Sequence, residues 1–135
     1  MCMALAAFAM SSCRSADQTA SLSAINGEWN IVKVNGQAVP AGEGNQPFIG
    51  FDVQKKAIHG NAGCNRMGGE FTTAAKNAIS FSRVVTTKMA CLNMTAEDRV
   101  LKALNAVQSY KVLRNGDVSL LDNSKKQVLL LEKKK

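Results

Sequence analysis

The chain has 135 residues, 46% of them hydrophobic, and a formal net charge of +7. This length and composition indicate one globular domain with a hydrophobic core, and they exclude a disordered chain and an ordinary transmembrane helix, which needs about 18 consecutive apolar residues. Much of the excess charge lies in lysine runs at residues 125–126 and 133–135, and a terminal block of this kind is more often a solvated tail than a patch for an anionic partner.

Residues 1–12 have the features of a lipoprotein-type signal peptide. Residues 1–10 are apolar and too short to cross a bilayer, but they fit the apolar region of a signal peptide. Residues 10–13 (MSSC) resemble a bacterial lipobox, which predicts Cys13 as the lipidated first residue of the mature protein. No basic residue precedes Arg14, which leaves open a start further upstream, and the alternative is a buried N-terminal helix with a chance cysteine.

Residues 13–24 form the predicted tether between the lipid and the domain. Their small and polar side chains are typical of a flexible linker. The folded domain is therefore expected to span residues 25–135. With a lipid anchor, it would lie in the bacterial cell envelope, at the outer membrane and facing the periplasm or the cell surface.

The first half of the domain predicts short strands joined by tight turns. Asn35-Gly36 is a strong hairpin signal, and Lys55-Lys56 closes a later strand with a polar turn. A loop rich in Gly and Asn covers residues 40–47. From their apolar and β-branched residues, strands are expected at residues 28–34, 48–53, 57–60, 68–72, 78–81 and 84–87.

The second half begins with one amphipathic helix, predicted over residues 96–106. Thr95 is the expected N-cap, with Asp98 completing a capping box. The apolar face consists of Val100, Leu101, Leu104 and Val107. Three more strands are expected at residues 110–113, 118–121 and 128–131.

These elements predict an α+β fold. Seven to nine strands with tight turns indicate a mostly antiparallel sheet. Because a sheet of this size tends to curl, we expect a strongly curved, partly open barrel with one packed α-helix.

Four cysteines constrain the domain further. Cys2 lies in the predicted signal peptide and Cys13 is the predicted lipid site, which leaves Cys64 and Cys91 for a disulfide in an oxidising compartment. A zinc site would need about four ligands, and only these two cysteines and His59 offer themselves. A Cys–His nucleophile using His59 lacks a third group. We expect no metal and no cofactor.

Two short blocks flank the region between these cysteines. Residues 63–66 read GCNR, followed by GEF at residues 69–71, and residues 86–91 read TTKMAC. Here the chain resembles the META domain family, also called HslJ-like. Trp29 and the helix after Cys91 also fit, so the resemblance covers residues 25–133, although Met67 replaces a common aromatic residue and Leu92 a frequent proline. The signature residues are Gly63, Cys64, Asn65, Arg66, Gly69, Thr87, Lys88, Met89, Ala90 and Cys91.

The resemblance implies a curved antiparallel sheet with one helix, and a disulfide between the two signature cysteines. Members of the family are often secreted proteins or lipoproteins, and no activity is established for them. They are linked to heat-shock expression, to novobiocin tolerance and to virulence in a protozoan parasite. The fold resembles that of a lipid-binding pilotin of type III secretion, which is an analogy of fold alone.

Two functions of different classes are compatible with the residues. The first is a non-catalytic envelope lipoprotein, monomeric and related to stress or to the envelope, that binds an apolar ligand or a protein partner. The second is a hydrolase-type enzyme with a site around His59 and Arg66. Neither implies a nucleic-acid partner, because the chain has few aromatic residues for stacking bases.

A binding module of the first kind has a candidate site where the helix meets the curved sheet. Leu101 and Leu104 would line an apolar seam. Arg66 and Lys88, whose charges have no evident structural role, would lie at its rim and receive an anionic group. The alternative is a fully packed interior without an opening, as close packing normally produces.

Overall fold

The computed structural model describes residues 22–39, 46–88, 91 and 94–134. The predicted signal peptide, Cys13 and most of the tether lie outside these residues, as do Met89 and Ala90 of the signature. The described part begins with a short 3-10 helix, η1 (Leu22–Ile25). Leu22 packs against the core and Ile25 is fully buried, so the folded part includes three residues that the sequence assigned to the tether.

Nine antiparallel strands and one α-helix make up the rest of the described chain, so the predicted α+β fold is confirmed. The strands are β1 (Gly27–Val34), β2 (Gln37–Ala38), β3 (Phe48–Asp52), β4 (Ala57–Asn61), β5 (Arg66–Ala74), β6 (Ala78–Thr86), β7 (Ser109–Val112), β8 (Val118–Leu121) and β9 (Gln127–Lys133), and the helix is α2 (Thr95–Ala106).

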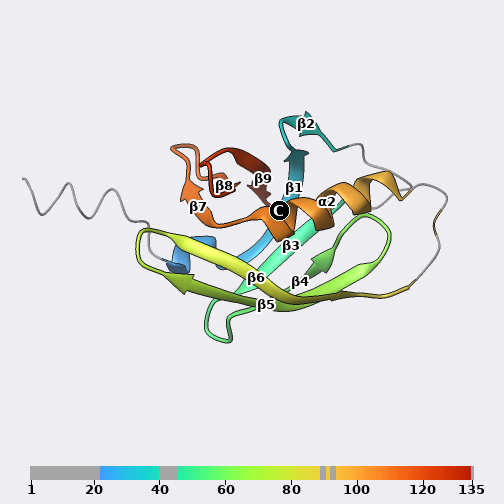
Figure 1. Ribbon diagram of the computed structural model, residues 1–135, viewed down its shortest axis with the longest axis horizontal. Helices are drawn as coiled ribbons and strands as arrows, with labels where there is room; N and C mark the ends of the chain where they lie inside the picture. Colours follow the sequence, from blue (N-terminus) through green and yellow to red (C-terminus); the bar gives the residue numbers. More distant parts are fainter. Residues whose placement is uncertain (1–21, 40–45, 89–90, 92–93, 135) are drawn as a thin grey trace, which may run out of the picture.

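The sheet curls into a ring that is not a regular barrel. The strands follow one another in the order β2-β1-β3-β4-β5-β6-β7-β8-β9, and β1 pairs again with β9. One junction is weak, because β6 and β7 share the single residue pair Ala78 and Ser109. Helix α2 connects these two strands and packs against β6, β9 and β1 (Figure 1). The helix therefore fills the place where strand pairing alone would leave the ring open.

The two strands predicted at residues 78–81 and 84–87 are one continuous strand, β6, with an irregularity in its middle. Arg83 has a left-handed backbone with φ 52°, and the register against β5 shifts between Gly68 and Glu70. Gly69 lies at this shift, where a Cβ atom would stand 3.1 Å from the Cα of Val84. A bulge of this kind interrupts the alternation of side chains, and in the sequence it looks like a turn.

Helix α2 begins one residue earlier than predicted, and the predicted cap is wrong. Its N-cap residue is Met94, with no side-chain capping bond, and Thr95 is already helical. The Asp98 N–H donates to the Met94 carbonyl oxygen at 2.9 Å. The acidic residue that anchors this end is Glu97. Its side chain is buried and accepts hydrogen bonds from the loop between β4 and β5.

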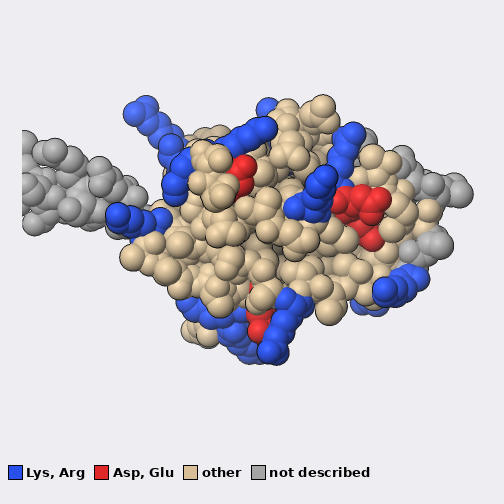
Figure 2. All heavy atoms as spheres, viewed as in Figure 1, with Lys and Arg blue, Asp and Glu red and all other residues tan. Residues whose placement is uncertain are grey.

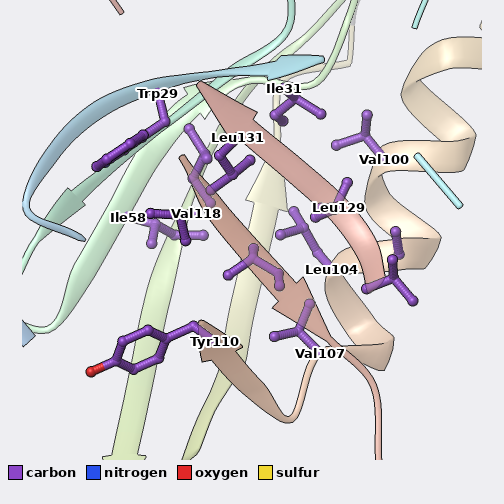
Figure 3. Packing of buried hydrophobic residues seen from close by; sticks show 14 of the residues in the cluster. Trp29, Ile31, Ile58, Val100, Leu104, Val107, Tyr110, Val118, Leu129 and Leu131 are labelled. Carbon is purple, nitrogen blue, oxygen red and sulfur yellow. The ribbon is translucent and has the colours of Figure 1, made fainter. Parts of the chain in front are cut away.

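The interior of the ring is packed with apolar side chains. Figure 3 shows Val100 and Leu104 of α2, and Val107 just after the helix, in one cluster with Leu129 of β9 and Ile31 of β1. All five are fully buried, and Leu101 is partly buried against the same cluster. The sequence left open whether the helix and the sheet enclose an apolar seam or a fully packed interior. The close packing at this place corresponds to the packed interior.

The terminal lysines do not form the predicted solvated tail at residues 133 and 134. The Lys133 amine lies 4.9 Å from the centre of the Trp29 ring, and the Lys134 amine lies 3.8 Å from that of Phe48. Lys134 also donates its backbone N–H to the carbonyl oxygen of Glu28 at 3.0 Å. Cation–π contacts and backbone pairing therefore hold the end of β9 on β1.

Candidate functional site: a carboxylate clamp beneath the signature loop

The loop between β4 and β5 binds a carboxylate from the helix. The Cys64 N–H and the Asn65 N–H donate to Oε1 of Glu97 at 3.1 and 2.6 Å, and Nδ2 of Asn65 donates to Oε2 at 2.8 Å. Glu97 is only 4% exposed and Asn65 only 3%. We call these three residues, Cys64, Asn65 and Glu97, the carboxylate clamp.

A third signature residue, Thr87, connects the clamp to the end of β6. The Thr87 hydroxyl donates to Oδ1 of Asn65 at 2.9 Å, and its oxygen accepts the Arg66 N–H at 3.1 Å. The Thr87 N–H donates in turn to the Arg66 carbonyl oxygen at 3.0 Å. The Asn65 side chain is thus bonded on both sides, which fixes the loop to the helix and to the end of β6.

Two opposing effects act on the pKa of Glu97. Burial disfavours the carboxylate and raises the pKa, but the hydrogen bonds from the Asn65 side chain and from the backbone N–H groups of Asn65 and Cys64 together outweigh it. The result is a pKa below the ordinary value of 4.5. Glu97 is therefore ionised at neutral pH, and its charge is neutralised by donors rather than by a cation.

The disulfide predicted between Cys64 and Cys91 is present, and their Cα atoms are 6.2 Å apart. It ties the clamp loop to the segment that leads into α2. Gly63 precedes it with φ +136°, and a Cβ atom there would lie 3.2 Å from the backbone nitrogen of Glu97. Only glycine combines that backbone conformation with so close an approach to the helix.

The signature residues therefore divide into a buried set and an exposed pair. Cys64, Asn65 and Thr87 take part in the clamp and its extension. Arg66 and Lys88 are exposed at the same end of the sheet. Leu104 is fully buried in the core and Leu101 partly so, so the structure does not bring these two leucines to an open seam with the two cations.

A second polar cluster lies on the outer side of the sheet. His59 Nε2 is 2.8 Å from Oε2 of Glu28, and the Lys134 amine is 3.4 Å from Oε1. The imidazole reaches Glu28 across Gly50, where a Cβ atom would collide with the ring. The hydrogen bond from His59 has the largest effect on the pKa of Glu28 and lowers it; burial acts in the opposite direction, and the nearby Lys134 charge adds to the lowering, so the pKa lies below its ordinary value of 4.5.

The residues of the alternative hydrolase site lie on neighbouring strands of this outer side. His59 of β4 pairs with Gly68 of β5, and Asn61 pairs with Arg66 two positions away. Both candidate side chains are exposed, and His59 contacts the carboxylate of Glu28. The geometry thus supplies an oriented imidazole on an open surface.

Charges are spread over the surface. On the face drawn in Figure 2, Lys and Arg side chains project at many places around the outline, with Asp and Glu beside some of them. Within residues 22–39, 46–88, 91 and 94–134, no group of three His, Cys, Asp or Glu side chains could hold a metal ion. No helix in that part of the chain is long and apolar enough to cross a membrane.

The model of the META domain family matches residues 20–135, which is most of the chain. The chain belongs to the META domain family. The GCN loop and the two signature cysteines, from which the resemblance was first inferred, are the residues that form the clamp and the disulfide. No curated protein sequence matches the chain.

Solved structures share the fold of this META domain. The NMR structure of a protein from Burkholderia xenovorans has a TM-score of 0.64 at 20% identity, covering 83% of this chain and 85% of the other. The crystal structure of a DUF4847 family protein from Bacteroides vulgatus has a TM-score of 0.58 at 16% identity, covering 82% and 94%. At these identities the likeness concerns the fold alone.

The sequence did not reveal the role of Glu97. Its partners lie 32 and 33 positions away in the chain. The local signal in this segment was the capping box of Thr95 and Asp98, which the structure does not form. Glu28 was missed for the same reason, since its partner His59 is 31 positions away.

Proposed function

We propose that this META domain is a non-catalytic binding module, held at the outer membrane of a bacterial envelope by a lipid on Cys13, and that its partner is an envelope protein. One observation supports the proposal above the others. The chemically distinctive signature residues are engaged inside the fold, in the carboxylate clamp and the disulfide. Groups that hold one another in this way build a scaffold, and the exposed side chains around them remain for recognition.

The packing favours a protein partner over an apolar ligand. A fatty acid between α2 and the sheet would have to displace side chains such as Leu104, which is fully buried. Close-packed interiors rarely open for a ligand without a cost of several kcal/mol. Arg66 and Lys88 are exposed beside the clamp, on a part of the surface fixed by the disulfide. We therefore assign the partner surface to these two cations.

The lipid anchor is tested on protein from a bacterial host that carries the natural precursor. We expect an acylated Cys13 as the first residue by mass spectrometry, and recovery of the protein with the membranes. A Cys13→Ser variant should move to the soluble fraction. Soluble native protein with an intact Met1 would contradict the anchor.

The partner surface is tested with a photoreactive amino acid placed at position 66 or 88, and at position 111 as the control. Lys111 is also an exposed cation, but it lies on β7, on another part of the ring. We expect a discrete crosslinked product from positions 66 and 88 alone. The partner, once purified, should bind saturably, and Arg66→Glu with Lys88→Glu should weaken that binding. Equal crosslinking from position 111 would contradict the assignment.

The apolar-ligand alternative is tested by NMR titration of the same protein with fatty acids and lysophospholipids. We expect no saturable shift at Leu101 or Leu104. Saturable shifts on both leucines, together with Arg66 or Lys88, would show that the seam opens and would replace the protein partner with a lipid.

A further inference from the structure

A pocket of about 600 Å3, open to solvent, lies where η1, the end of β3 and His59 meet. Its size falls within the range of about 300–1,000 Å3 that is usual for small-molecule sites. It lies apart from the clamp. The lining residues are Ser23, Asn26, Phe51, Asp52, Val53, Gln54 and His59.

Small residues explain why the sheet is hollow here. On the outer side of β3 and β4, Gly50 pairs with His59, and Asp52 pairs with Ala57. Gly50 leaves room for the His59 ring, and Ala57 leaves space beside Asp52 that a larger side chain would fill. The His59 ring leans over Gly50 to Glu28, so it forms a wall whose orientation is set before any ligand arrives. Such preorganisation reduces the entropy lost on binding.

The chemistry of the lining selects among ligand classes. No Lys or Arg is among the lining residues, which disfavours an anion. The lining contains the carboxylate of Asp52, but its Oδ1 already accepts hydrogen bonds from the N–H groups of Gln54 and Lys55, which disfavours a cation. The net charge of +7 further disfavours a cation.

The remaining lining groups both donate and accept hydrogen bonds. The side chains of Asn26 and Gln54 are amides, and His59 has Nδ1 beyond the Nε2 that meets Glu28. Val53, which is partly exposed, adds apolar surface. A ligand that matches this lining carries several hydroxyl groups, no net charge and some exposed C–H surface.

We propose that this pocket binds a neutral saccharide, with Gln54 and His59 making direct contacts. Because the pocket is open at the surface, a sugar unit within a longer glycan can enter it. The inference does not depend on the lipid anchor or on the protein partner, since it rests on a different surface.

The test is NMR titration of the 135-residue chain with chitotetraose, cellotetraose and maltotetraose, each to about 10 mM, which detects millimolar dissociation constants. We expect at least one of them to cause saturable amide shifts at Asn26, Val53, Gln54 and His59. His59→Ala and Gln54→Ala should each weaken binding by roughly three- to ten-fold, the usual effect of one lost hydrogen bond.

The matched control is Glu28→Gln. It removes the carboxylate charge but leaves an amide that can still hydrogen-bond the exposed imidazole, so His59 stays in the wall and the affinity should stay within about two-fold of wild type. Absence of saturable shifts with all three saccharides would overturn the proposal. Shifts at the same amides with inorganic phosphate or putrescine, and with no saccharide, would overturn the ligand class.

Discussion

Glu97 is a buried negative charge that three hydrogen-bond donors of one loop share. Buried carboxylates are normally paired with a cation or lose their charge. Here the backbone N–H groups of Cys64 and Asn65 supply the compensation, as in an anion-binding nest. The position of the GCN loop therefore depends on a residue more than thirty positions further along the chain.

We predict that Glu97→Gln lowers the free energy of unfolding by about 2–3 kcal/mol, because a neutral amide loses the charge-assisted bonds and turns an N–H group toward other donors. Urea unfolding followed by circular dichroism gives the difference. The control is Asp98→Asn, an exposed residue of the same helical turn, which should change stability by less than about 0.5 kcal/mol. Equal effects of the two variants would refute the clamp.

The contribution of Glu97 should depend on pH in a defined direction. Its pKa is lowered on folding from the ordinary value of 4.5, so the folded state binds fewer protons than the unfolded state in acid. The stability difference between wild type and Glu97→Gln should be full above pH 4.5 and shrink as the pH falls through the lowered pKa. A difference that grows below pH 4.5 would contradict this sign.

At the scale of elements, helix α2 packs at the junction of β6 and β7, where strand pairing is nearly absent. The strands on either side of it, β6 and β7, share one residue pair. Two sets of contacts hold the helix in this place: the clamp and the disulfide at its N-terminal end, and buried apolar residues along its inner face.

Loss of the disulfide should cost about 2–5 kcal/mol, as for other bridges in small domains. Cys64→Ser, Cys91→Ser and the double variant should show nearly the same loss in urea unfolding, because each removes the same bond. Labelling of both cysteines by a maleimide in the oxidised native protein would show that the bond is absent in solution.

The inner face of α2 is tested by Leu104→Ala. Leu104 is fully buried, and removing such a side chain costs about 2–5 kcal/mol. Asn105→Ala on the exposed face of the same helix is the matched control and should stay within about 0.5 kcal/mol of wild type. Thermal unfolding of both variants measures the two stability changes. A small loss of stability in Leu104→Ala would mean that the seam between helix and sheet is loosely packed.

For the whole molecule, the sequence predicts the local elements and leaves the joining contacts open. Asn35 and Gly36 have positive φ, as the hairpin signal requires, and the alternating strands appear where expected. The bulge in β6, the true start of α2 and the attachment of Lys134 to Phe48 were missed. The bulge and the Lys134 contact depend on partners distant in the chain, which periodicity and propensity do not report.

The pairing of β1 with β9 closes the ring. Deletion of residues 127–135 removes this pairing and the buried Val128, Leu129 and Leu131, so we expect the loss of a cooperative urea transition by circular dichroism. Deletion of residues 134–135 alone leaves β9 intact, and that variant should still unfold cooperatively. A cooperative transition in the longer deletion would show that the ring is not required for folding.

The contact between the first strand and the last has a consequence for synthesis. A ribosome releases a chain from its N-terminus, so β1 emerges long before β9, and β1 has no closing partner until β9 has been made. Until then Trp29 and Ile31 lack the β9 neighbours that help to bury them. The ring of the growing chain therefore cannot close before β9 has been synthesised. A polypeptide whose ring has not yet closed can pass through a narrow pore without first having to break this pairing.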